Sequence, residues 1–283
     1  MRNTFDFFNF LLTNYLPRSA ATRFMGWFSK INSPLLTWFS LRVWRIFADD
    51  LNLAEARKSS FNSLHDCFVR ELKPGVRPLT TDPEALASPC DAVIGAHGRV
   101  DGSQLLQIKG SPYTLEELLP IDGLAENYRD GCYVTLRLKS SMYHHMHAPA
   151  DCRISRLDYI SGDTWNVNPP TLRRLQKVFC KNERVALPLE TRWSDTSLLL
   201  VPVAAVLVAS IRLHCLPYPL NLAYRGPNHF TFDAAYRRGE DMGYFEHGST
   251  IIMLCKGPWE FCKQVKEGAV IRMGEALLRR HNH

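Results

Sequence analysis

The sequence lacks the segments that mark several large classes of protein. No apolar run is long enough to span a bilayer. The best candidate, residues 198–211, is short and contains Pro202, so it favours buried strands over a membrane helix. Near the N-terminus an apolar stretch is interrupted by Asp6, Asn9 and Asn14, which makes it a poor match to a signal peptide. The absence of low-complexity tracts argues against a disordered chain, and no internal repeat is evident.

Two chemical signatures are also absent. The 8 cysteines are scattered and form no Cys-x-x-Cys pair, so the sequence predicts neither a zinc knuckle nor a disulfide framework. This usage favours reduced, mostly buried thiols and a cytosolic compartment. No Gly-x-Ser-x-Gly occurs, which argues against the nucleophile elbow of an α/β-hydrolase.

The composition is that of a folded, moderately basic protein. The chain has 283 residues, of which 46% are hydrophobic, enough for one substantial core or two closely joined units. The formal net charge of +6 suits either an anionic membrane surface or a nucleic acid.

The spacing of apolar residues divides the chain into an N-terminal helical region, residues 1–60, and a larger domain, residues 61–283. In the first region apolar side chains recur at helical spacing, and Pro17 and Pro34 separate the segments. After a connecting segment over 61–80 the pattern is typical of short strands, with helices expected only near 114–119 and 170–178. We therefore predict an α+β fold with a predominantly β core, sandwich-like or barrel-like, behind amphipathic helices. The expected strands cover residues 92–94, 133–138, 153–154, 184–187, 198–201, 205–211 and 250–254.

The N-terminal region interleaves aromatic and basic residues, and two interpretations stand. Short amphipathic helices of this kind suit the interfacial zone of a membrane, where each basic residue contributes about 1 kcal/mol near an anionic surface. Alternatively, the helices cap the main domain and pack their aromatic side chains onto its core.

Three polar clusters are candidates for chemistry. Gly248-Ser249-Thr250 places a hydroxyl beside a residue whose backbone bends freely, although the same tripeptide also forms ordinary turns before strands. His144, His145 and His147 follow a strand and suit a metal site, general-base catalysis or a polar loop. Asp91 precedes an apolar strand, where it either caps a turn or orients a histidine.

Taken together, motifs along the chain resemble those of the proteobacterial phosphatidylserine decarboxylases, which are pyruvoyl-dependent enzymes. The resemblance covers about residues 60–274 and is looser in the N-terminal helices. The matching motifs, in chain order, are Phe68-Val69-Arg70-Glu71-Leu72-Lys73, Arg77-Pro78, Ser88-Pro89-Cys90-Asp91, the run from Lys109 to Leu119, Tyr143-His144 with His147 and Pro149, Gly162-Asp163, Val167-Asn168, Asn182-Glu183-Arg184, and Gly239-Glu240-x-Met242-Gly243-x-Phe245 leading to Gly248-Ser249-Thr250.

The resemblance implies that the chain cuts itself. Ser249 attacks the carbonyl of Gly248 to form an ester. Elimination across Ser249 then leaves dehydroalanine, which is hydrolysed to a pyruvoyl group at position 249 with loss of ammonia. The products are a large β chain, 1–248, and a small α chain, 249–283, which form a heterodimer; a higher oligomer is an open alternative. Asp91 and His147 match the residues that activate the serine in this family, and serine needs such help because its hydroxyl is a weak nucleophile. His144 matches a histidine that assists substrate binding or proton transfer.

The resemblance also implies the reaction and its setting. The pyruvoyl group forms a Schiff base with phosphatidylserine and acts as an electron sink while carbon dioxide is lost, which gives phosphatidylethanolamine. No metal and no nucleic acid are expected. The enzyme is expected at the cytoplasmic side of the cell membrane, held there as a peripheral protein.

Several positions depart from the family pattern. His247 stands where an aliphatic residue is usual, Met142 where an acidic residue often precedes Tyr-His, His145 where arginine is common and Ala204 where glycine often occurs. None removes a group that the chemistry needs, but His247 predicts a pH-dependent rate of self-cleavage. Three alternative functions remain: a non-catalytic membrane-binding protein, a zinc hydrolase built on the three histidines, and a pyruvoyl decarboxylase for another amino-acid substrate.

Overall fold

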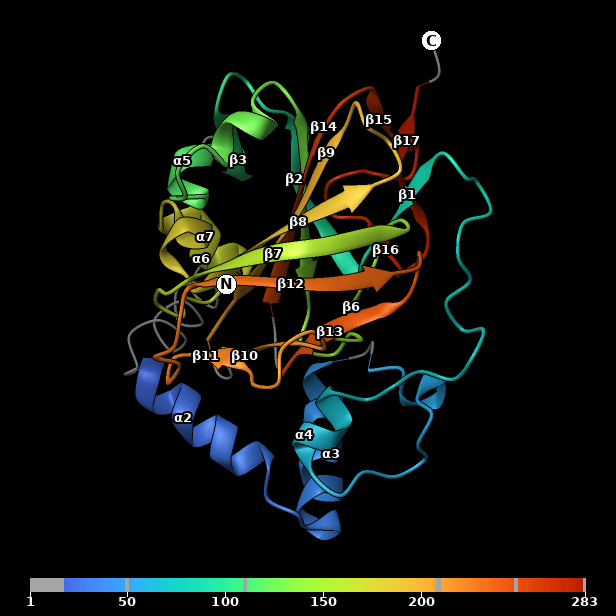
Figure 1. Ribbon diagram of the computed structural model, residues 1–283. Coiled ribbons are helices and arrows are strands. Elements are labelled where there is room, and N and C mark those ends of the chain that lie inside the picture. The colour runs from blue at the N-terminus through green and yellow to red at the C-terminus, as the bar shows by residue number, and fades with distance from the viewer. Residues whose placement is uncertain (1–17, 49–50, 109–110, 207–209, 247–248, 282–283) are drawn as a thin grey trace.

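An eight-stranded antiparallel sheet forms the centre of the β core (Figure 1). The computed structural model describes residues 18–48, 51–108, 111–206, 210–246 and 249–281. Strand β14 lies in the interior of the sheet, paired along its length with β5 and β9. In spatial order the strands are β12 (His229–Tyr236), β7 (Cys152–Ile160), β8 (Arg184–Thr191), β9 (Ser197–Ala204), β14 (Ser249–Lys256), β5 (Cys132–Leu138), β2 (Ala92–Arg99) and β16 (Val270–Ile271).

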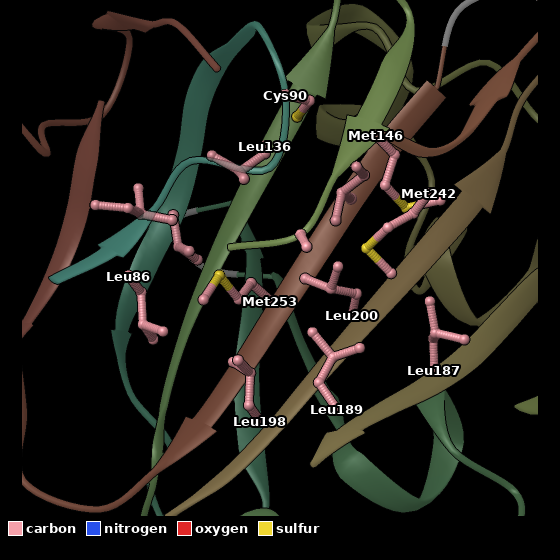
Figure 2. Close-up of a cluster of buried hydrophobic side chains, with 14 of the residues drawn as sticks. Leu86, Cys90, Leu136, Met146, Leu187, Leu189, Leu198, Leu200, Met242 and Met253 are labelled. Atoms are coloured by element: carbon pink, nitrogen blue, oxygen red, sulfur yellow. The ribbon is translucent and has the colours of Figure 1, made fainter. Parts of the chain in front are cut away.

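Two smaller sheets cover one face of the large sheet. The first has the order β11 (Leu220–Asn221), β10 (Ser210–Leu213), β13 (Asp241–Phe245) and β6 (His145–His147). The second has the order β1 (Ala85–Ala87), β17 (Ala276–Arg280) and β15 (Trp259–Phe261). Apolar side chains from the layers interdigitate between them, among them Leu136, Met146 and Met253 (Figure 2).

The opposite face of the large sheet is covered as well. A hairpin and short helices pack over a second apolar cluster there. Because both faces of β9 and β14 are buried, these strands carry nearly uninterrupted apolar runs instead of alternation. The covering elements are β3 (Gln104–Ile108), β4 (Ser111–Thr114), α5 (Leu115–Leu118), η2 (Ala125–Tyr128), α6 (Pro169–Arg174) and α7 (Val178–Lys181).

The N-terminal helices gather at the end of the β core where β10 and β11 lie (Figure 1). They are α2 (Arg18–Ser29), α3 (Pro34–Phe47), the turn η1 (Leu53–Glu55) and α4 (Leu64–Phe68). Helix α3 begins after Ser33, whose hydroxyl accepts the Leu36 N–H, and Pro34 at its first position lacks the N–H that would otherwise be unpaired.

Helices α2 and α3 carry an exposed apolar face. Leu35 is 77% exposed and Trp27 is 64% exposed. The other members of this outer face are Phe24, Trp38, Phe39, Val43 and Ile46. Among the described residues no helix is both long and apolar enough to cross a membrane.

The predicted fold class, α+β with a predominantly β core and N-terminal helices, is confirmed. Three local predictions are wrong. The strand expected over 205–211 does not start there, because β9 ends at Ala204 and β10 begins only at Ser210. The connecting segment 61–80 contains the short helix α4, and the helix expected over 170–178 is two short helices, α6 and α7. The helix expected before Pro17 lies outside the described residues.

Candidate functional site

Ser249 opens the central strand β14. Its Cα is paired with Leu138 of β5 on one side and Ala204 of β9 on the other. Directly opposed residues of antiparallel strands share a face of the sheet, so the Ser249 side chain points toward the layer formed by β6, β10 and β13. The residue is fully buried, and its Oγ has no hydrogen-bond partner among the described residues. An unpaired buried hydroxyl costs about 1–3 kcal/mol, so this one calls for a functional explanation.

A cavity of about 500 Å³ lies beside this end of the sheet. Leu138 forms part of its wall, as do Ala205 and Val206, which continue the chain beyond Ala204. Helices α2, α3 and α4 close the other side with Met25, Ser40, Trp44, Leu64 and Phe68. The serine therefore lies where β strands and N-terminal helices enclose a largely apolar space.

The three clustered histidines are placed by the pairing of β6 with β13. The Phe245 N–H donates to the His144 carbonyl at 3.0 Å, at the end of β13 from which the chain runs on to Ser249. His147 is paired with Asp241, at the opposite end of β13. Along this ladder His144 is thus the histidine nearer to the segment that precedes the serine.

His144 is completely buried, and neither ring nitrogen makes a hydrogen bond of good geometry to a described residue. Burial lowers its pKa to about 3 because it disfavours the charged ring; the Arg70 charge acts in the same direction, and the Met142 backbone opposes it. Its ring meets the edge of Phe68 at 5.9 Å between centroids, and Phe68 lines the cavity. His144 is therefore a neutral imidazole beside the cavity wall.

His147 is fixed by two hydrogen bonds of different kinds. Its Nδ1 lies 2.9 Å from the Gly239 carbonyl, which only accepts, so Nδ1 carries the proton. Its Nε2 lies 2.9 Å from the Tyr143 hydroxyl and accepts from it. Burial lowers the pKa of His147, so the ring is neutral. Gly239 has φ +83°, and a Cβ there would lie 2.6 Å from Leu79, so the position requires glycine.

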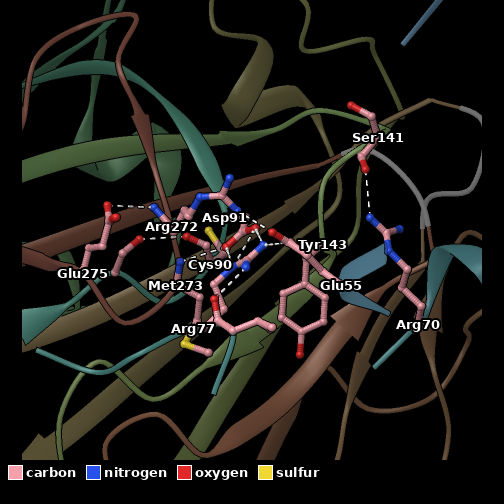
Figure 3. A network of polar contacts seen from close by, with 12 residues as sticks. Glu55, Arg70, Arg77, Cys90, Asp91, Ser141, Tyr143, Arg272, Met273 and Glu275 are labelled. Atoms are coloured by element: carbon pink, nitrogen blue, oxygen red, sulfur yellow. Dashed lines mark hydrogen bonds and ion pairs between the residues drawn. The ribbon is translucent and has the colours of Figure 1, made fainter. Parts of the chain in front are cut away.

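The Asp91 carboxylate accepts hydrogen bonds from the Arg77 guanidinium, as Figure 3 shows. Arg77 donates from Nε to Oδ1 at 2.9 Å and from Nη2 to Oδ2 at 2.6 Å, and the Met273 N–H donates to Oδ1 at 2.9 Å. Arg77 also pairs with Glu55 at 2.7 Å. The His147 N–H donates to the Pro89 carbonyl at 2.7 Å, which brings Asp91 and His147 to the same corner of the fold.

The His145 ring is hydrogen-bonded through both of its nitrogens, which the sequence did not predict. Its Nδ1 lies 2.6 Å from Asp241 Oδ2 and its Nε2 lies 3.2 Å from the Val69 carbonyl. Both partners are hydrogen-bond acceptors, and together they fix the orientation of the ring beside the carboxylate. Burial tends to raise the pKa of Asp241, but its hydrogen bond and charge pairing with His145 outweigh burial and lower it. Tyr143 stacks on the same ring at 4.8 Å.

The structure thus divides the predicted site residues between two places. Asp91, His147 and Tyr143 share one polar corner, whereas Ser249 and His144 each adjoin a residue of the cavity wall, Leu138 and Phe68 respectively. No hydrogen bond joins Ser249 to His147 or Asp91 within the described ranges, and His247 and Gly248 lie outside them. In the same ranges no group of three or more His, Cys, Asp or Glu side chains is arranged to hold a metal ion.

Sequence reasoning missed three functional candidates in this region: Arg77, Tyr143 in its contact with His147, and Arg137, which lines the cavity. Arg77 and Tyr143 both occur in motifs that the sequence displays, in Arg77-Pro78 and Tyr143-His144. What each touches lies far away in the chain and is set by the tertiary fold. Nothing in the sequence around Arg137 distinguishes it.

Comparison with known proteins assigns the chain to a family. The family model described as phosphatidylserine decarboxylase matches residues 64–279. A protein of Vibrio cholerae named phosphatidylserine decarboxylase proenzyme is 35% identical over 275 residues, 93% of this chain and 95% of that protein. Two further proteins of the same name are also similar. That of Polaromonas naphthalenivorans is 34% identical, with 93% of each chain covered. That of Saccharophagus degradans is 31% identical over 94% of this chain and 95% of its own length. The chain belongs to the phosphatidylserine decarboxylase family.

Proposed function

We propose that this chain is the proenzyme of a phosphatidylserine decarboxylase that cuts itself between Gly248 and Ser249. The observation that carries the proposal is the Ser249 hydroxyl, fully buried, without a partner among the described residues, and next to a cavity of about 500 Å³. Family membership and the relatives named as proenzymes support the same activity, the conversion of phosphatidylserine to phosphatidylethanolamine and carbon dioxide.

Self-cleavage begins with Ser249 in this proposal. Its Oγ bonds to the Gly248 carbonyl carbon, the peptide C–N bond breaks, and the hydroxyl proton moves to a base while the amine gains one. His147 is our proposed base, since its Nε2 is the unprotonated nitrogen and Nδ1 is fixed as a donor. In the uncut protein the Tyr143 hydroxyl donates a hydrogen bond to His147 Nε2, so during cleavage this hydroxyl must turn away or relay the proton. In this proposal Asp91 contributes to cleavage through its negative charge, from its position beside Arg77.

The surroundings of Ser249 fit a pyruvoyl group formed from its own atoms. Ser249 is fully buried, and Phe68 and Leu138 contribute apolar side chains to the wall of the neighbouring cavity. A pyruvoyl group supplies an electrophilic carbonyl and an electron sink for the loss of carbon dioxide from an amine substrate. His144 is the proposed proton carrier, because a neutral imidazole exposes one donor and one acceptor nitrogen.

The cut chains are expected to stay together as a heterodimer of 1–248 and 249–283. The small chain contributes β14 to the interior of the eight-stranded sheet, where Ile251, Met253 and their neighbours are fully buried between β5 and β9. Removing it would expose that apolar surface and unpair two ladders of backbone hydrogen bonds.

The N-terminal helices suit a lipid substrate. Their outer face exposes Trp27 and Leu35 with the other apolar residues of α2 and α3, whereas their inner face lines the cavity. Arg42 lies over the Trp38 ring at 4.8 Å and adds a cation to the outer face. Exposed apolar side chains suggest peripheral association with a membrane. We propose that residues 1–60 hold the enzyme on the cytoplasmic surface of an anionic membrane, while 61–283 carry the chemistry.

Intact-mass analysis of purified protein tests the proposal. The native chain is expected to give two fragments, split between 248 and 249, with a blocked N-terminus on the smaller, and to release carbon dioxide from phosphatidylserine vesicles. Ser249→Ala is expected to give one uncut, inactive chain. Ser210→Ala is the matched control, because Ser210 is another buried hydroxyl without a partner among the described residues, and it should be cut. An uncut native chain that still decarboxylates the lipid would refute the proposal.

A further inference from the structure

Arg137 is a partly buried cation that the mechanism above does not use. It lies on β5 with its Cα opposite Thr250, the neighbour of Ser249. Its guanidinium makes no hydrogen bond or ion pair with any described residue. Burial lowers its pKa, and no carboxylate offsets that effect. A charge removed from water without a partner is costly, so an arginine at this depth with no partner among the described residues is suited to an anionic ligand.

Three other arginines with low exposure, Arg70, Arg77 and Arg184, behave differently. Arg70 donates to the carbonyls of Cys67, Leu51 and Ser141, the last contact visible in Figure 3. Arg77 pairs with two carboxylates, those of Asp91 and Glu55. Arg184 donates to four backbone carbonyls, those of Leu118, Cys180, Asn182 and Glu117. Each of these three guanidinium groups makes hydrogen bonds inside the protein, whereas the Arg137 guanidinium makes none with a described residue.

The position of Arg137 connects it to the space beside Ser249. It lines the cavity described above and also a second cavity of about 550 Å³ on the face of the sheet covered by α6. Arg137 and Lys139 are the charged residues that line the first cavity, and no carboxylate does so among the described residues. The cavity therefore combines an apolar wall from helices α2–α4 with a positive end at β5. This is the polarity of a bilayer lipid, with acyl chains at one end and an anionic headgroup at the other.

We propose that Arg137 binds the phosphate of the lipid headgroup and so sets the position of the amine at residue 249. This inference rests on the proposed function and names the group that recognises its substrate. A planar guanidinium donates two parallel hydrogen bonds to a phosphate, which makes arginine suited to such a contact. The phosphate is the better partner than the headgroup carboxylate. A cation paired with the carboxylate would stabilise the ground state, because that charge disappears when carbon dioxide leaves.

Binding to the uncut protein tests the inference without depending on cleavage. Ser249→Ala serves as the parent, and calorimetry measures its Kd for soluble short-chain phosphatidylserine, short-chain phosphatidylethanolamine and inorganic phosphate. Adding Arg137→Gln is expected to raise the Kd for both lipids by about tenfold to a hundredfold, the range for loss of a charge-assisted hydrogen bond. Arg137→Lys should recover part of that loss. Arg153→Gln, which removes an exposed arginine elsewhere on the sheet, is the matched control and should leave both Kd values unchanged.

Each outcome decides the question. The two lipids share only the phosphate among their anionic groups, so an equal rise in Kd for both supports the inference. A rise in Kd for phosphatidylserine alone assigns Arg137 to the carboxylate and overturns the inference. Inorganic phosphate binding as tightly as the lipids would indicate a free-phosphate site and would also overturn it. Unchanged lipid binding in Arg137→Gln refutes the inference alone if the native chain still forms phosphatidylethanolamine. A native chain without that activity refutes the proposed function instead.

In the cleavable protein, Arg137→Gln should mature to the same two fragments as native. Its KM for short-chain phosphatidylserine should rise by a similar factor. A merely structural role for Arg137 would instead lower the yield of folded, cut protein and leave the KM of the surviving enzyme unchanged, and that result would overturn the inference.

Discussion

Replacing Arg77 by methionine is expected to destabilise the protein strongly. The guanidinium donates to both oxygens of Asp91 and to Glu55, and the side chains of Arg77 and Asp91 are only 5% and 7% exposed. Methionine fills much of the volume but provides no donor. It would leave the Asp91 carboxylate buried with the Met273 N–H as its remaining hydrogen-bond donor among the described residues.

The magnitude follows from the burial of the pair. Breaking a buried ion pair by removing one partner typically costs 3–5 kcal/mol, because the other charge stays in a medium that solvates it poorly. For a chain of this size that corresponds to a fall in Tm of roughly 6 to 20 °C. The double variant Arg77→Met/Asp91→Asn should recover part of the loss, since a neutral amide leaves no charge unpaired.

Thermal unfolding of the uncut protein is the assay, with Ser249→Ala as the parent so that cleavage does not alter the transition. Arg57→Met is the matched control. Arg57 pairs with Glu71 at 2.7 Å, but the two side chains are 70% and 61% exposed, so its loss should cost less than about 1 kcal/mol. If Arg77→Met melts within about 2 °C of its parent, the pair does not stabilise the corner and our reasoning about Asp91 is wrong.

Three further predictions follow from the same structure. Tyr143→Phe removes the hydroxyl that donates to His147 Nε2, so we expect the rate of self-cleavage to change at least several-fold while the fold is retained. The rate is measured by the appearance of the small fragment. An unchanged rate would show that Tyr143 takes no part in the cleavage reaction. Trp38→Asp on the outer helical face should reduce sedimentation with anionic vesicles without affecting cleavage, and undiminished sedimentation would contradict the membrane role of that face. Burial raises the pKa of Glu183 to about 7, although the Tyr159 hydroxyl hydrogen-bonded to it opposes the shift. A carboxyl with a raised folded-state pKa binds its proton more tightly when folded, so its contribution to stability is present below the unfolded pKa and is lost as the pH rises to about 7. Glu183→Gln should therefore gain about 3 kcal/mol over native at pH 8 and little at pH 4.5, measured by urea unfolding, and equal differences at the two pH values would refute the assignment.

The sequence predicted the elements whose information is local. The apolar runs at 198–201 and 250–254 predicted β9 and β14, and the helical spacing of apolar residues after Pro34 predicted α3. It failed where the structure depends on distant partners. Strand β6 is a short polar run that is a strand only because β13 pairs with it, and β12 shows no apolar run because it lies at the edge of the large sheet.

What the sequence alone determined is the set of motifs that identify the family, together with the fold class and the candidate residues Asp91, His144, His147 and Ser249. A linear motif fixes which groups are present, since the chemistry depends on residue type. The roles predicted for these residues remain predictions.

Only the tertiary structure decided which groups meet. His145 contacts Asp241 and Val69, which lie 96 and 76 residues away in the chain, and Arg77 takes the Asp91 carboxylate that the sequence had associated with His147. Arg137 differs from Arg70, Arg77 and Arg184 in having no partner among the described residues, which no sequence pattern records. Hydrogen bonds and ion pairs form over a few ångströms of space, and the separation of residues along the chain does not measure that distance.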